Sequence, residues 1–265
     1  MKRPIGIFDS GVGGLSVVKE ILEHCKGEDI IYFGDTARVP YGTKSRDTIV
    51  RFSIENTKIL LNFNIKLLVV ACNTASSFSL PTLRRRFNIP IVGVLHPGAV
   101  EAVRVSSNKR IGVIGTSATI SSRSYEKDIL KIASDYLVFT QDCPLFVSLV
   151  EEGWLDDEIT FQVANRYLAP LKKKRIDTLI LGCTHYPLLK NIIGKVMGDK
   201  VHLVDSAHQT AGMVREMLKG DDCREACKAK GKEAVCKFYV SDEPEKFVLS
   251  GEKFLGRKIN FVRKI

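Results

Sequence analysis

The chain has 265 residues, 45% of them hydrophobic, and a formal net charge of +10. This composition is typical of a globular protein with one large or two small domains, and it excludes disordered, collagen-like and disulfide-dense chains. The apolar run 67–72 is far shorter than the roughly 20 residues of a membrane-spanning helix. The apolar stretch 5–8 ends at Asp9, too early for a signal peptide. We therefore expect a cytoplasmic protein with no membrane partner.

Short apolar runs alternate with amphipathic segments along the chain. The runs are continuous, a pattern typical of parallel strands buried on both faces. The predicted strands are 4–8, 30–34, 67–71, 91–94, 110–114, 137–140, 178–181, 202–204, 235–240 and 258–262. The predicted helices are one from Leu15 to about Gly27, one capped by Ser45, one that Pro81 begins or kinks, and two over 156–173 and 207–218. This alternation predicts an α/β fold with mainly parallel sheets.

A weak internal repeat divides the chain. Residues 5–10 resemble 111–116, and residues 69–74 resemble 180–185 at nearly the same spacing. We therefore expect two related α/β domains with the active site in the cleft between them. The predicted limits are 1–97 for the first domain, 98–207 for the second and 208–265 for a C-terminal segment that returns to the first, with a polar surface excursion over 219–232.

The positive charge gathers in two runs, 84–86 and 172–175, each at the end of a predicted helix. Cations there complement the helix dipole, so we favour a role in capping and solubility. No nucleic-acid-binding motif accompanies the charge, and we expect no nucleic-acid partner. A nucleic-acid-binding module stays open as an alternative, which steeply salt-dependent binding would reveal.

The seven cysteines are odd in number, which argues against a disulfide framework. Cys223, Cys227 and Cys236 are spaced loosely like metal ligands, but no histidine and no clear fourth ligand lies nearby. We expect free thiols there and no metal in the protein. A zinc site or a thiol switch is the alternative, and metal analysis distinguishes them.

Four motifs follow predicted strands, at the sheet edge where α/β proteins bind ligands. The loop 9–14 reads Asp-Ser-Gly-Val-Gly-Gly and can approach an anion with its backbone, and the loop 34–42 contains a Pro-Tyr-Gly turn. The motifs 71–74 and 182–185 each put a cysteine where a strand ends and a helix begins. A helix N-terminus lowers the pKa of a thiol, so we expect both thiols to ionise readily.

Cys72 and Cys183 are therefore expected to face each other across one small ligand. This arrangement suits a two-base reaction, in which one thiolate removes a proton from one face of a carbon and the other thiol donates to the opposite face. Asp9 and His185 are placed to act as their proton partners. Burial as a small apolar side chain is the common explanation for one such cysteine, but two in matching contexts favour chemistry.

These motifs resemble those of the glutamate racemases in the aspartate/glutamate racemase superfamily. The resemblance covers essentially the whole chain, in the segments 5–14, 32–42, 69–76, 111–120, 143–153 and 179–188. It implies interconversion of L- and D-glutamate without a cofactor, a supply of D-glutamate for peptidoglycan, and a homodimer of unspecified geometry. A racemase for another amino acid such as aspartate is the alternative, because one methylene is worth only about 1–3 kcal/mol of discrimination.

The resemblance also implies roles for individual residues. Cys72 and Cys183 match the two catalytic cysteines, and Asp9, Glu151 and His185 match the assisting acid–base residues. The implied substrate-binding residues are Asp9, Ser10, Pro40, Tyr41, Gly42, Asn73, Thr74, Thr116, Thr184 and His185. Two segments depart from the usual pattern, 95–97 with His96 and 205–209 with His208. Neither lies in the motifs that carry the reaction.

Overall fold

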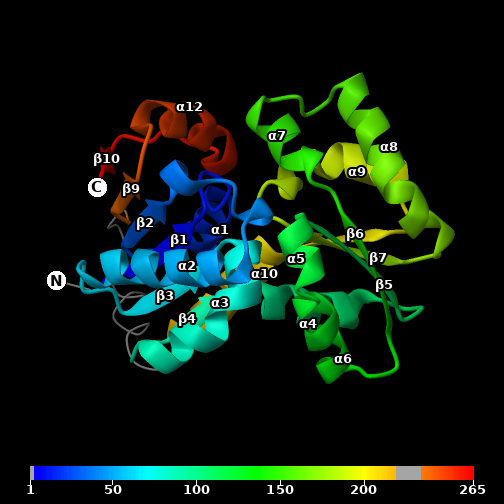
Figure 1. The fold of residues 1–265 in the computed structure, drawn as a ribbon, viewed down its shortest axis with the longest axis horizontal. Helices are drawn as coiled ribbons and strands as arrows, with labels where there is room; N and C mark the ends of the chain where they lie inside the picture. The colour runs from blue at the N-terminus through cyan, green and yellow to red at the C-terminus, as the bar shows by residue number, and fades with distance from the viewer. Residues whose placement is uncertain (1–2, 219–233) are drawn as a thin grey trace.

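The computed structural model describes residues 3–218 and 234–265, which form two lobes side by side (Figure 1). Each lobe is built on one parallel sheet, with strand order β10-β9-β2-β1-β3-β4 in the first and β6-β5-β7-β8 in the second. The strands are β1 (Ile5–Asp9), β2 (Ile30–Gly34), β3 (Leu67–Val70), β4 (Ile91–Gly93), β5 (Arg110–Gly115), β6 (Leu137–Asp142), β7 (Thr178–Gly182), β8 (His202–Asp205), β9 (Cys236–Val240) and β10 (Val262–Lys264). The predicted α/β class with parallel sheets is confirmed.

Helices cover the two sheets and fill the space between the lobes. They are α1 (Leu15–His24), α2 (Arg46–Leu61), α3 (Asn73–Arg86), α4 (Leu95–Val105), α5 (Ser117–Ser121), α6 (Ser124–Ile132), α7 (Leu145–Glu151), α8 (Glu158–Lys173), α9 (Lys190–Met197), α10 (Ser206–Leu218) and α12 (Pro244–Leu255), with 3-10 turns η1 (Thr36–Arg38), η2 (Tyr41–Thr43) and η3 (Tyr186–Leu189). Ser45 caps α2 as predicted, since its side chain accepts from the Thr48 N–H. The basic runs lie in the last turns of α3 and α8.

Buried apolar strands hold the molecule together. Every residue of β1, β2, β3 and β7 is buried, as continuous apolar runs in parallel sheets predict. One apolar cluster extends from Ile7 of the first sheet to Leu181 of the second. The two lobes therefore share a core. No helix among the described residues combines the length and the apolarity needed to cross a membrane.

Two predicted strands differ from the observed ones. β6 pairs only with β5, so it is an edge strand, and its Leu137 is 51% exposed rather than buried. The strand predicted over 258–262 is β10 instead, which begins at Val262 and pairs with β9. Ile259 is buried, and its N–H donates to Glu252 Oε1 at 3.0 Å instead of joining a sheet.

Pro81 neither begins nor ends a helix, because α3 runs through it. A proline inside a helix removes the N–H that would donate to the carbonyl four residues earlier. That carbonyl belongs to Ser77, and it accepts from Ser124 Oγ of α6 at 3.0 Å. The second lobe thus satisfies a backbone group that the proline leaves free in the first.

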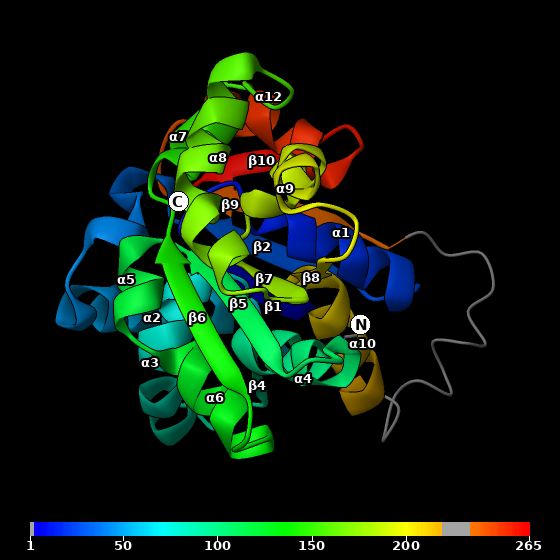
Figure 2. The ribbon, with the colours of Figure 1, turned by 90° about the vertical axis from the view of Figure 1, so that its right-hand side faces the viewer.

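The chain crosses from the second lobe back to the first through α10 (Figure 2). α10 follows β8 and packs on α1 and α4, after which β9 pairs with β2 of the first sheet. The predicted limit after Pro97 falls inside α4, and the predicted limit after residue 207 falls in the first turn of α10, which begins at Ser206. The domain limits 1–97, 98–207 and 208–265 stay predictions. The excursion over 219–232, with Cys223 and Cys227, lies outside the described residues.

Candidate active site

The carboxyl ends of β1, β3, β5 and β7 bring the candidate residues of both lobes together. Asp9 ends β1, Cys72 follows β3, Thr116 follows β5 and Cys183 follows β7. All but Thr116 are buried. Within each parallel sheet these ends lie on one edge, and the two edges meet where Thr74 Oγ1 lies 2.9 Å from Thr116 Oγ1.

Cys72 is the N-cap of α3, and its Sγ accepts from the Ala75 N–H at 3.4 Å. Ser10 Oγ lies 3.7 Å from the same sulfur. Burial nevertheless raises the pKa of the Cys72 thiol to about 12, with further contributions from the Asp9 charge and from Cys183. The predicted lowering of this pKa is therefore wrong, because desolvation outweighs the helix N-terminus.

Cys183 has different surroundings. No α-helix starts directly after it; the 3-10 turn η3 begins at Tyr186, so the predicted helix start is wrong here. Its Sγ lies 3.9 Å from His185 Nδ1, and the other ring nitrogen, Nε2, lies 3.0 Å from Glu151 Oε1. Sulfur, imidazole and carboxylate therefore form a connected series from the end of β7 to the end of α7.

His185 favours its charged form between Cys183 and Glu151. Burial lowers its pKa, but the hydrogen bonds and charges of Cys183 and Glu151 outweigh burial and raise the pKa to about 10. The same hydrogen bond lowers the pKa of Glu151. Near neutral pH the pair is therefore an imidazolium beside a carboxylate.

Asp9 lies at the opposite side, near Cys72. Its Oδ2 accepts from the Gly11 N–H at 2.9 Å. Burial raises its pKa, and the charge of His185 opposes that shift. Its Oδ1 is buried and has no hydrogen-bond partner among the described residues. The Gly14 N–H also helps to hold down the Asp9 pKa, so a ligand donor would add to the backbone contacts of this buried carboxylate.

Asn73 is a second buried group with an open position. Its Oδ1 accepts from Tyr125 OH at 2.7 Å, while its Nδ2 has no partner in the described part of the chain. Beside it, Thr74 Oγ1 lies 2.9 Å from Thr116 Oγ1 and 3.0 Å from Thr119 Oγ1. Donors from both lobes therefore gather next to an amide N–H that is free to bind a carboxylate.

In the loop of Pro40, Tyr41 and Gly42, the phenol of Tyr41 does not face a ligand as the sequence suggested. Pro40 is exposed, and the buried Tyr41 hydroxyl donates to Asp35 Oδ2 while accepting from Asn56 Nδ2 at 3.0 Å. The phenol is thus bound within the first lobe. Only the backbone of this loop is left to face a ligand.

Two glycines mark where the lobes touch. A Cβ atom at Gly13 would lie 2.4 Å from Thr184 Oγ1 and 2.6 Å from His185 Nδ1. A Cβ atom at Gly42 would lie 2.7 Å from Thr116 Cβ. Their small size lets the lobes approach each other around the candidate site. The sequence had instead suggested that the glycines of the loop 9–14 let the backbone approach a ligand.

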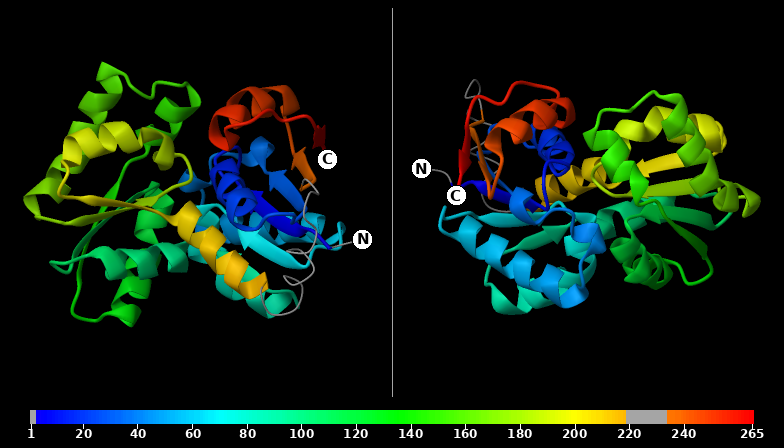
Figure 3. Two further views of the ribbon diagram at one scale, coloured as in Figure 1. Left: turned by 180° about the vertical axis from the view of Figure 1, so that it is seen from behind. Right: turned by 45° about the horizontal axis from the view of Figure 1, so that its top comes forward.

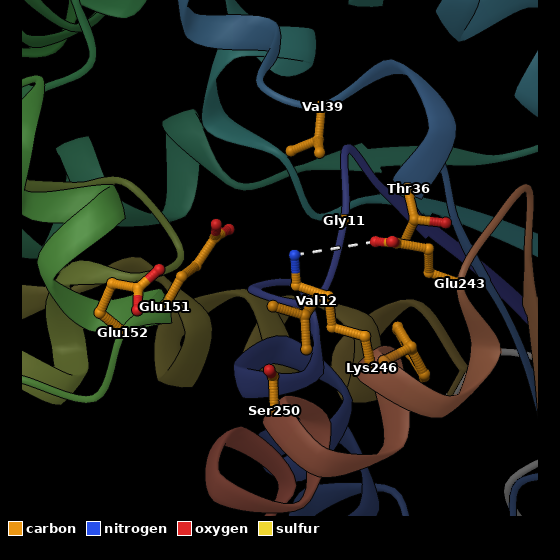
Figure 4. Close-up of a pocket in the computed structure, with 10 residues that line it drawn as sticks. Gly11, Val12, Thr36, Val39, Glu151, Glu152, Glu243, Lys246 and Ser250 are labelled. Atoms are coloured by element: carbon orange, nitrogen blue, oxygen red, sulfur yellow. Dashed lines mark ion pairs between the residues drawn. The ribbon is translucent and has the colours of Figure 1, made fainter.

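A cavity of about 100 Å³ adjoins the site (Figure 4). It is lined by Gly11, Val12, Thr36, Val39, Glu151, Glu152, Glu243, Lys246, Phe247 and Ser250. Lys246 Nζ lies 3.7 Å from Glu243 Oε2 at its edge. Because Glu151 both lines the cavity and contacts His185, the cavity reaches the site from the side of α7 and α12.

Sequence reasoning missed two buried tyrosines. Tyr125 of α6 holds the Asn73 amide, and Tyr32 of β2 donates to the Gly11 carbonyl at 2.7 Å. Burial raises the pKa of Tyr32, and the charges of the nearby Asp9 and Cys72 raise it further. Neither tyrosine lies at a predicted strand end. Each occupies a buried position within a strand or helix, and the sequence pattern at such a position does not indicate which group its hydroxyl contacts.

Comparison with known proteins identifies the family. A family model described as Asp/Glu/Hydantoin racemase matches residues 5–214. The chain belongs to this racemase family. It is 50% identical over 263 residues to the glutamate racemase of Geobacter metallireducens, covering 99% of this chain and 96% of that one. It is 44% identical over 265 residues to a glutamate racemase of Neisseria meningitidis, covering 100% and 97%. The predicted relationship to the glutamate racemases, which are isomerases, is confirmed.

Solved structures of this racemase family agree. A glutamate racemase isoform from Bacillus anthracis superposes with a TM-score of 0.93 at 38% identity, covering 99% of this chain and 97% of that one. The Francisella tularensis glutamate racemase in complex with D-glutamate gives 0.90 at 39%, with the same coverage. An aspartate racemase homologue from Pyrococcus horikoshii gives 0.59 at 18% identity, over 82% of this chain and 100% of that one, and shares the fold alone.

Proposed function

We propose that the protein interconverts L- and D-glutamate by moving the α-proton between two thiols, those of Cys72 and Cys183. One observation carries this proposal. Two buried thiols, one from each lobe, are close enough for charge on one to raise the pKa of the other, and each has its own acid–base partner. Glutamate is preferred as substrate because the relatives at 38% identity or more named above are glutamate racemases, one of them in complex with D-glutamate.

An α-amino acid fits the open polar positions. Its ammonium can donate to the unpaired Oδ1 of Asp9, and a carboxylate can accept from the unpaired Nδ2 of Asn73. The backbone and side chains of Ser10, Thr74 and Thr184 offer further donors. We assign Pro40, Tyr41, Gly42 and Thr116 to the rim of the same site. Preorganised donors of this kind stabilise the charge that develops when the α-proton leaves.

The raised pKa of Cys72 favours one starting form of the site. Near neutral pH Cys72 carries its proton, because its pKa is raised to about 12. Cys183 then serves as the base, and Cys72 donates its proton to the opposite face of the α-carbon. His185, with Glu151, exchanges a proton with Cys183, and Asp9 does so with Cys72. The reverse reaction starts from the opposite assignment.

The wider role follows from the product. We propose a cytoplasmic homodimer that supplies D-glutamate for peptidoglycan and so supports cell-wall synthesis and cell shape, without an added cofactor and without a nucleic-acid or membrane partner. Light scattering of the purified protein tests the dimer. Growth of a D-glutamate auxotroph on expression of the chain tests the supply.

Substrate choice is tested by circular dichroism on L-glutamate, D-glutamate and both aspartates, with no cofactor added. We expect both glutamate enantiomers to lose optical activity and both aspartates to react far more slowly. One missing methylene is worth about 1–3 kcal/mol, so the difference should be at least about tenfold. Turnover of aspartate without turnover of glutamate would overturn the assignment.

A further inference from the structure

A cluster of three metal-ligating side chains lies outside the active site, where α1 and α10 run side by side (Figure 3). Glu20 and His24 lie one turn apart on α1, and His208 lies opposite them on α10. One ligand atom of each residue lies within 4.8 Å of the others. The reaction proposed above uses none of the three.

The contacts within the cluster are close. His208 Nδ1 lies 2.9 Å from Glu20 Oε2. The two imidazole rings meet edge to face with centroids 4.6 Å apart. A metal with bonds of about 2.0–2.1 Å to tetrahedral ligands needs them about 3.4 Å apart. Small side-chain rotations are therefore enough to close the cluster around an ion.

The tautomer of His24 suits a metal ligand. Its Nδ1 lies 2.8 Å from the backbone carbonyl oxygen of Glu20. Because a carbonyl only accepts, Nδ1 carries the proton and Nε2 keeps its lone pair. Histidines that bind metals usually donate their other ring N–H to a carbonyl or a carboxylate in this way.

We propose that Glu20, His24 and His208 bind one divalent transition-metal ion such as Zn²⁺, with a water as fourth ligand. Two imidazoles and a carboxylate suit zinc, cobalt and nickel rather than calcium or magnesium. The His208 side chain is 57% exposed, so an ion can enter from solvent. This proposal departs from the sequence expectation of no metal, which weighed only the cysteines 223, 227 and 236.

A bound ion would join two segments that are far apart in the sequence. α1 follows the first strand of the first sheet, and α10 follows the last strand of the second sheet. An ion held by both helices would tie the crossing helix to the first lobe. Since the ion binds the folded protein, it should also raise the thermal midpoint.

Cobalt chloride is the probe, because Co²⁺ bound to nitrogen and oxygen absorbs in the visible and gives no sulfur-to-metal band in the near ultraviolet. The full chain is titrated in a phosphine reductant. We expect one equivalent to bind, and His208→Gln and His24→Gln each to weaken binding by at least about tenfold. His96→Gln is the matched control, because His96 pairs with Asp128 elsewhere on the surface. It should bind as the unchanged protein does.

The thermal midpoint gives a second readout that does not depend on colour. Cobalt should raise it in the unchanged protein and in His96→Gln, but not in His208→Gln. Equal affinity in His208→Gln, a near-ultraviolet sulfur band that accounts for the bound cobalt, or no binding at millimolar cobalt would overturn the proposal. Glu20→Gln repeats the test should a histidine variant fail to fold.

Discussion

Cys72 and Cys183 occupy equivalent strand ends, but their neighbours differ in charge. Cys72 has the buried carboxylate of Asp9 nearby, which together with burial raises its pKa to about 12. Cys183 has His185, whose own pKa is raised to about 10. L- and D-glutamate have equal free energies in solution, but the two sides of the site differ in charge. The two directions of the reaction therefore begin from forms of unequal abundance.

We expect Cys72→Ser and Cys183→Ser each to abolish racemisation while the protein still folds. A serine hydroxyl keeps the size of the thiol but ionises far less readily, so the base is lost and the packing is kept. Racemisation is followed by circular dichroism and folding by thermal unfolding. The control is Cys143→Ser, which changes a buried thiol that we assign no role in the reaction. Near-normal turnover of Cys72→Ser or of Cys183→Ser would show that the substituted cysteine has only a structural role.

Tyr125 should act by positioning Asn73. Tyr125→Phe removes the hydroxyl that donates to Asn73 Oδ1 at 2.7 Å and so frees the amide to rotate. We expect kcat/KM to fall about tenfold and the free energy of unfolding to fall by about 1–2 kcal/mol. Tyr136→Phe is the control, because its hydroxyl bonds the Val103 carbonyl away from the site. A loss of stability with unchanged kcat/KM would reduce Tyr125 to a structural residue.

Glu151 should set the pH dependence of His185. The folded protein holds a proton on His185 up to about pH 10, whereas the unfolded chain releases it near 6.5. This contribution to the free energy of unfolding is therefore complete below about pH 6.5 and is lost as the pH rises through about 10. Glu151→Gln removes one of the groups that raise this pKa, so the loss should still begin near pH 6.5 but should be smaller and complete at a lower pH.

Urea unfolding at several pH values between about 6 and 10 measures this shift, and the alkaline limb of kcat/KM should move in the same direction. Glu152→Gln is the matched control, since Glu152 is exposed and adjacent but is absent from the groups that raise the His185 pKa. An alkaline limb that stays in place in Glu151→Gln would show that His185 does not take part in proton transfer.

At the scale of elements, hydrophobic pattern predicted most strands because both faces of a central parallel strand are apolar. β1, β2 and β7 were found within one residue of their observed limits. Edge strands varied: β4 and β8 were predicted within one residue of their limits, whereas β6 is half exposed and β10 is only three residues long with one partner. Short helices such as α5 and α7 hold too few turns for a periodic stripe, and they went unpredicted.

Gly13 tests the contact between the loop 9–14 and the motif 182–185. Gly13→Ala would place a methyl group 2.4 Å from Thr184 Oγ1 and 2.6 Å from His185 Nδ1. Both neighbours are buried, so we expect the two motifs to move apart and kcat/KM to fall at least about tenfold. Gly212→Ala is the control, because its methyl group meets nothing within 4 Å in the middle of α10. Steady-state kinetics give kcat/KM of both variants. Equal kcat/KM of Gly13→Ala and Gly212→Ala would exclude a tight contact at Gly13.

At the scale of the whole molecule, the internal repeat indicated that two lobes would each contribute a cysteine. What the repeat could not supply is the electrostatic balance of the assembled site. A helix N-terminus is visible in the sequence, but the extent of burial around Cys72 depends on how the lobes close over it. The tyrosines and the contacts of Gly13 depend on the same closure. Which residues gather at the strand ends could therefore be predicted better than their ionisation.

The two-lobed arrangement makes a prediction about solvent hydrogen. In the proposed mechanism each thiol meets one face of the α-carbon, so a proton removed by one thiolate stays on that side, while the product receives its hydrogen from the other thiol. In deuterium oxide starting from L-glutamate, early D-glutamate should carry deuterium and unreacted L-glutamate almost none. A single base that exchanges freely would label both enantiomers at comparable rates. Mass spectrometry of the separated enantiomers at low conversion distinguishes the two cases, and rapid labelling of the remaining L-glutamate would contradict the two-thiol mechanism.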